Sequence, residues 1–72
     1  MAQPKSILTP REEEVAALVA TGRTNRQIGR MLGIAEKTAE VHVHNIIGKL
    51  GARCRAEVAA WSVARQLTNI QG

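Results

Sequence analysis

Two helical patterns in this sequence are separated by only three residues, Gly33 to Ala35, and this short connection limits the possible folds more than any other feature. The first pattern, over residues 25–32, places Ile28 and Leu32 on one face, and the second runs over residues 36–50. The Gly ends the first helix because it adopts the left-handed conformation easily. Two helices joined by such a turn form a helix-turn-helix, which we predict at the centre of the chain.

Further helical patterns lie on both sides of this motif. Thr9-Pro10-Arg11-Glu12 combines an N-cap, a Pro at the first helical position and a Glu three residues after the cap, which predicts a helix over residues 10–21. Gly51 ends the helix over residues 36–50, and a last helix is predicted over residues 55–67. The predicted fold class is all-α, a four-helix bundle with a central helix-turn-helix.

The chain has to fold around one core without a covalent or metal crosslink. Its 72 residues suffice for one domain, which we place at residues 8–67, between a flexible arm at 1–7 and a tail at 68–72. A single Cys excludes an intramolecular disulfide, and no Cys/His cluster offers a metal site. No cofactor is expected. No apolar run is long enough to span a membrane, so we expect a cytoplasmic protein.

Positive charge is concentrated in the middle of the chain. The formal net charge is +4, and the stretch from Val15 to Arg55 contains seven bases against two acids. Such a concentration suits a polyanion, although a solvated basic face without a ligand remains the alternative on charge alone. Trp61 is the only aromatic residue, so the stacking platforms of RNA and single-strand binders are missing. Duplex DNA is the predicted partner.

The helix predicted at 36–50 divides into two faces at about 100° per residue. Its core face holds Ala39, Val43, Ile46 and Leu50, with Ile47 at the edge. The opposite face holds Lys37, Glu40, Val41, His44 and Gly48. These side chains are mostly short, which suits a helix lying deep in the major groove. Thr38, His42, Asn45 and Lys49 lie between the two faces, within reach of flanking phosphates.

Catalysis and metal binding are not favoured. His42 and His44 are two residues apart and point about 200° from each other on a helix, so they cannot share one ion without a third partner. Ser6 and Ser62 have no nearby His with an orienting acid, and no Gly-rich phosphate loop is present. We therefore predict that the chain is not an enzyme.

The order of these residues resembles LuxR-type DNA-binding domains, also called NarL- or GerE-type. The resemblance extends over about Leu8 to Leu67 and is carried by Leu8-Thr9-Pro10-Arg11-Glu12, Glu14-Val15, Gly22, Thr24-Asn25, Ile28, Leu32-Gly33-Ile34, Glu36-Lys37-Thr38, His42-Val43, Asn45-Ile46, Lys49-Leu50-Gly51 and Arg53. It implies a bacterial four-helix domain whose third helix enters the major groove and whose fourth helix often pairs two copies.

The resemblance and the helical angles together assign roles to individual residues. Base edges are expected to be contacted by Glu40, Val41 and His44. The DNA backbone is expected to be contacted by Arg26, Arg30, Lys37, Thr38, His42, Asn45, Lys49 and Arg53. The dimer interface is expected to include Val58, Trp61, Ser62 and Arg65, although Trp61 suits a place in the core between the first and fourth helices equally well.

Three positions depart from the pattern of the family. Thr38-Ala39-Glu40 stands where Thr-Val-Lys is commonest, a variant similar to the DNA-binding ends of large actinobacterial LuxR-type regulators. Glu40 gives up a phosphate or guanine contact there and is able to accept from cytosine N4. Ala35 replaces the usual Ser or Thr cap of the recognition helix, and Cys54 replaces a Ser cap of the fourth helix.

The predicted function is sequence-specific binding of double-stranded promoter DNA by a homodimer, as the output domain of a bacterial transcriptional regulator that acts through RNA polymerase. Two alternatives stay open. One is region four of a sigma factor, which does not account for Lys49-Leu50-Gly51-Ala52-Arg53. The other is a protein-interaction or dimerisation module in which Glu40 suppresses DNA binding.

Overall fold

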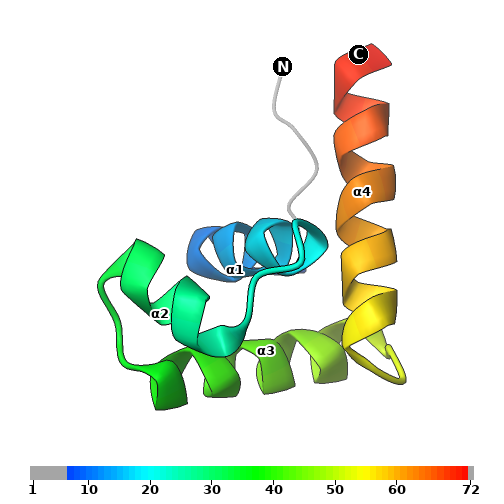
Figure 1. The fold of residues 1–72 in the computed structure, drawn as a ribbon. Helices are drawn as coiled ribbons and strands as arrows, with labels where there is room; N and C mark the ends of the chain where they lie inside the picture. The colour runs from blue at the N-terminus through cyan, green and yellow to red at the C-terminus, as the bar shows by residue number, and fades with distance from the viewer. Residues whose placement is uncertain (1–6, 72) are drawn as a thin grey trace.

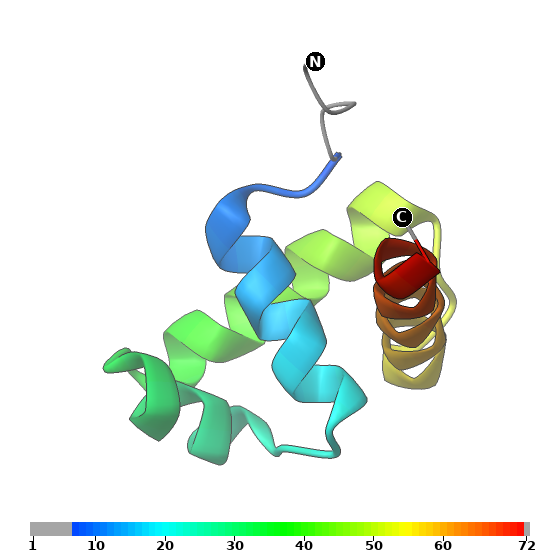
Figure 2. The same cartoon turned by 90° about the horizontal axis from the view of Figure 1, so that it is seen from above.

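The computed structural model describes residues 7–71 of the chain, with side chains up to Leu67. This part of the chain contains four helices and no strand: α1 (Pro10–Ala20), α2 (Asn25–Leu32), α3 (Glu36–Leu50) and α4 (Arg55–Gln71). In Figure 1, α1 lies above α3, α2 packs beside the N-terminal half of α3, and α4 stands at the C-terminal end of α3. Figure 2 shows α1 crossing over α3. The predicted all-α fold with four helices is confirmed.

Two helix ends differ from the prediction. α1 ends at Ala20, one residue early, because Thr21 is its C-cap and donates its N–H to the Leu18 carbonyl. α4 continues to Gln71, so residues 68–71 are helical where a tail was predicted. Neither Gly nor Pro interrupts the sequence of α4. The predicted flexible arm lies outside the described residues except for Ile7, which is exposed.

Capping boxes begin α1 and α2. The Thr9 hydroxyl accepts from the Glu12 N–H, while Glu12 Oε1 accepts from the Thr9 N–H at 2.9 Å. Thr24 and Gln27 form the same reciprocal pair at the start of α2. α3 begins after Ala35, which provides no side-chain cap, as its sequence indicated. α3 therefore starts with less local support than the two helices before it.

The core is aliphatic and lies where α1, α3 and α4 meet. Its buried apolar side chains come from all four helices and the segment before α1, and are Leu8, Val15, Ala16, Val19, Ile28, Ala39, Val43, Ile46 and Val58. Trp61 is half-buried and packs at the edge of this cluster. No helix in the part of the chain that the structure describes is long and apolar enough to cross a membrane.

Gly29 allows the helix-turn-helix to close tightly. It lies inside α2, and a Cβ atom built on it would be 2.7 Å from the Ile34 carbonyl oxygen and 3.3 Å from the Glu36 backbone nitrogen. The Gly29 carbonyl also accepts from the Ile34 N–H at 2.8 Å. This close approach is made by the backbone of the turn that leads into α3.

Glu12 joins α1 to the C-terminal end of α3. Its carboxylate is almost completely buried, and its Oε1 accepts from Lys49 Nζ at 2.8 Å as well as from the Thr9 N–H. The Lys49 ammonium, together with the Thr9 N–H, lowers the pKa of Glu12, although burial opposes this shift. A buried carboxylate is tolerated because each of these donors stabilises its charge.

We expect Gly29→Ala to lower the free energy of unfolding by about 1–3 kcal/mol, since the added methyl has to displace turn backbone. Gly48→Ala is the matched control, because a Cβ at this helical position in α3 meets nothing within 4 Å. The control should raise stability by about 0.5–1 kcal/mol. Chemical denaturation of both variants measures the difference, and equal effects would contradict the close approach at Gly29.

The lowered pKa of Glu12 predicts an acid-sensitive fold. Because the folded-state pKa lies below the ordinary value of 4.5, this contribution to stability is complete above that value and is lost as pH falls through the folded pKa. Glu12→Gln should lower the free energy of unfolding at pH 7 by about 1 kcal/mol. It should also make this free energy fall less steeply as the pH is lowered. Thermal unfolding between pH 7 and pH 3 measures both effects. Glu36→Gln is the control, because Glu36 is exposed. Parallel curves for wild type and Glu12→Gln would refute this role.

Candidate nucleic-acid interface

The outer face of α3 is open. α1 and α2 cover the opposite side of this helix, and no other helix lies below it in Figure 1. Ala39, Val43 and Ile46 are buried, and Ile47 and Leu50 are half-buried, so the predicted core face is confirmed. The predicted base-contact residues Glu40, Val41 and His44 are all exposed. The structure thus brings these three together on one accessible surface.

An ion pair lies on this open face. Lys37 Nζ is 3.3 Å from Glu40 Oε1, one helical turn away, and both side chains are more than half exposed. An exposed pair of this kind adds little stability, but it places opposite charges side by side. The N-terminal half of the open face therefore carries little net charge, as the Thr38-Ala39-Glu40 variant suggested.

The residues of α3 that are predicted to contact the DNA backbone differ in exposure and in their contacts within the chain. Thr38 and Asn45 are exposed, while His42 is half-buried. Lys49 is partly exposed, but its ammonium is held by Glu12. Lys49 and Glu12 are 37 positions apart in the sequence, so the helical angles of α3 could not predict this contact. A contact from Lys49 to phosphate would have to compete with the buried carboxylate.

Four arginines with free side chains flank α3. They are Arg23, Arg26, Arg30 and Arg53, all exposed and without an ion pair to another described residue. Three of them were predicted as backbone contacts, whereas Arg23 was not. Positive charge available to a ligand therefore lies on α2, on the loop before it and on the loop before α4, more than on α3 itself.

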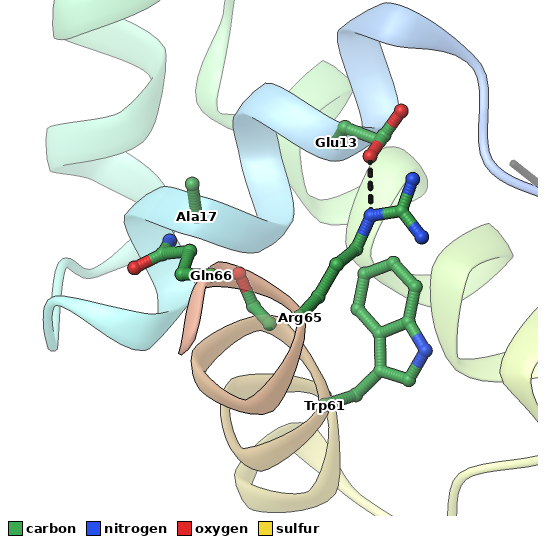
Figure 3. Close-up of a pocket in the computed structure, with 6 residues that line it drawn as sticks. Glu13, Ala17, Trp61, Arg65 and Gln66 are labelled. Atoms are coloured by element: carbon green, nitrogen blue, oxygen red, sulfur yellow. Dashed lines mark hydrogen bonds and ion pairs between the residues drawn. The ribbon is translucent and has the colours of Figure 1, made fainter. Parts of the chain in front are cut away.

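The face of α4 predicted for dimerisation is largely turned toward the core. Val58 and Ser62, which were predicted at the dimer interface, are buried within the chain and are not part of the exposed surface of α4. Figure 3 shows why Arg65 and Trp61 also serve the monomer: Arg65 Nε contacts Glu13 of α1 at 3.0 Å, and its guanidinium lies 5.4 Å from the centre of the indole ring. These residues border a pocket of about 130 Å³ between α1 and α4.

A second apolar stripe runs along the other side of α4. It consists of Ala56, Ala60, Val63 and Leu67, all exposed, and their spacing of four, three and four residues keeps them on one side of the helix. Val63 is 44% exposed and Leu67 58% exposed, high values for large apolar side chains. Because the helical angles of α4 show two apolar faces, sequence alone does not tell which one the core covers.

Comparison with known proteins places this arrangement in a family. The model of "Bacterial regulatory proteins, luxR family" matches residues 6–62. LiaR, a transcriptional regulatory protein of Bacillus subtilis, is 40% identical over 68 residues, which are 94% of this chain and 32% of LiaR. The nitrate/nitrite response regulator NarL of Escherichia coli is 43% identical over 54 residues, covering 75% of this chain and 25% of NarL. The chain thus spans about a third or less of these relatives.

A solved structure shows the same fold. The transcription factor GerE superposes with a TM-score of 0.75 and 34% sequence identity, covering 86% of this chain and 91% of GerE. The resemblance seen in the sequence is therefore supported by the family model, by full-length relatives and by three-dimensional structure. The chain belongs to the luxR family of bacterial regulatory proteins.

Proposed function

We propose that this chain is the DNA-binding output domain of a bacterial transcriptional regulator, acting in the cytoplasm. The observation that carries the proposal is the open outer face of α3, presented by a helix-turn-helix and flanked by free arginines. The relatives LiaR, NarL and GerE are regulators or transcription factors by name, which supports it. We assign the chain no catalytic activity.

In this proposal α3 lies in the major groove, and different residues contribute specificity and affinity. Glu40, Val41 and His44 face base edges, where a carboxylate accepts from cytosine N4 and an apolar side chain meets a thymine methyl. The backbone is contacted from α2, α3 and the loop before α4 by Arg26, Arg30, Lys37, Thr38, His42, Asn45, Lys49 and Arg53. Arg26, Arg30 and Arg53 contribute most of the affinity, because their charges are free in the unbound protein.

Two copies pair on promoter DNA through α4 in this proposal. The contact surface is the exposed stripe of Ala56, Ala60, Val63 and Leu67. Trp61 and Arg65 lie on the core side of α4, where Arg65 is paired with Glu13. Pairing places two recognition helices on half-sites about one turn of DNA apart. The regulator then acts on transcription through RNA polymerase.

Salt dependence tests the DNA-binding proposal. Wild-type protein should bind random duplex DNA at low salt, with log affinity falling linearly as log salt rises. Arg26→Ala with Arg30→Ala should lower the slope by about 2, since each lost phosphate contact removes about 0.9. Fluorescence anisotropy with labelled duplex measures the slopes.

One further variant serves as a control for this measurement, and another tests sequence specificity. Arg11→Ala removes an exposed charge from α1, on the side of α3 away from the open face, and should leave the slope unchanged. Glu40→Ala should change the base pairs preferred in selection from a random pool, because it alters a proposed base contact. Absence of any binding at low salt would contradict the proposal and favour a protein-interaction module.

Pairing through α4 has a separate prediction. Leu67→Glu should abolish cooperative binding to two half-sites and leave affinity for one half-site within about twofold, because a buried unpaired charge is costly only in the paired state. Gel shifts on one-site and two-site duplexes measure the difference. Gln66→Glu adds the same charge off the apolar stripe and should bind as wild type. Retained cooperativity in Leu67→Glu would refute this surface.

A further inference from the structure

Arg55, the first residue of α4, reaches the beginning of α2. Its Nη1 donates to Asn25 Oδ1 at 2.6 Å, and its Nη2 donates to the Arg23 carbonyl oxygen. The residue is half-buried, unlike the free arginines around it. One guanidinium thus holds both the first residue of α2 and the backbone of the loop before it.

This contact closes a loop around the helix-turn-helix. Asn25 begins α2 and Arg55 begins α4, 30 positions later, so the segment from Asn25 to Arg55 contains α2, the turn and the whole of α3. α2 and α4 do not pack against each other, and α2 itself buries only Ile28 and Gly29. The Arg55 side chain therefore supplies the link between the N-terminal ends of these two helices.

We infer that Arg55 is a positioning residue for DNA binding, which fixes the helix-turn-helix relative to α4. The inference rests on the proposed function, in which α3 reads DNA and α4 pairs two copies. The separation and orientation of two recognition helices then depend on how α2 and α3 are held against α4. The guanidinium fork suits this task because its two nitrogens point at two different acceptors, which a lysine ammonium cannot reproduce.

The roles of phosphate contact and positioning predict different effects of substitution. A phosphate contact depends on charge, so lysine would retain the slope of affinity against salt. A positioning contact depends on geometry, so Arg55→Lys should weaken binding to two half-sites by about tenfold with an unchanged slope. Binding to one half-site should change by less than about threefold, because no second copy has to be aligned.

The experiment uses the 72-residue chain and duplexes obtained by selection from a random pool, carrying one or two half-sites. Arg55→Lys, Asn25→Ala and the double variant are compared by anisotropy, and each is checked for folding by circular dichroism. Both single variants should lose two-site affinity, and the double variant should lose no more than Arg55→Lys alone, because Asn25→Ala breaks a contact that Arg55→Lys has already broken. Asn25→Asp combined with Arg55→Lys should recover part of the loss through a new ion pair. Arg11→Lys is the matched control, because Arg11 is exposed on α1 and has no proposed role in DNA binding, and it should bind as wild type.

Hydrogen exchange separates this inference from the proposed function. In the free protein, Arg55→Lys should speed exchange of α2 amides while α1 amides keep their rates. If Arg55→Lys speeds exchange of α2 amides but wild type binds no DNA, the proposed function fails. The positioning role in DNA binding then fails with it, while the structural link from Arg55 to α2 stands. Unchanged two-site binding by Arg55→Lys, additive losses in the double variant, or unchanged α2 exchange would overturn the inference. Should Arg55→Lys not fold, Asn25→Ala decides by the same criteria.

Discussion

The Glu12 carboxylate is the contact on which the arrangement of the described helices depends most. It completes the capping box that begins α1 and also holds Lys49 in the last turn of α3. One buried charge therefore fixes where α1 starts and where α3 lies beneath it. A core of aliphatic side chains cannot specify a crossing so closely, because apolar contacts have little directionality, whereas a hydrogen-bonded carboxylate has defined donor positions.

This contact also determines which charges remain for a ligand. Lys49 is held by Glu12, and Lys37 lies beside Glu40, so both lysines of α3 have acidic partners within the chain. The arginines of α2 and of the loops have no such partners among the described residues. In the proposed complex with DNA, electrostatic attraction comes from the surroundings of α3, while the open face of α3 carries short side chains and a carboxylate.

What could be predicted from the sequence was largely local. The Thr9 capping box and the uncapped start at Ala35 both follow from residues within a few positions of one another. The core and open faces of α3 follow equally from helical angles. The contact from Arg55 to Asn25 could not be predicted, because it joins residues 30 positions apart and involves two polar residues with no common pattern.

The burial of Val58 and Ser62 could not be predicted for a related reason. α4 carries apolar residues on two sides, and a helical projection shows both without showing which one meets α1. Only the packed structure reveals that Val58 belongs to the core and that Val63 and Leu67 stay outside. A helix with two apolar sides is able to complete its own domain and still present a surface to a second one, whereas a helix with one apolar side uses it in the core. Because the core side of α4 is fixed by Glu13 and Val58, its outer side can vary in sequence without changing how α3 is supported.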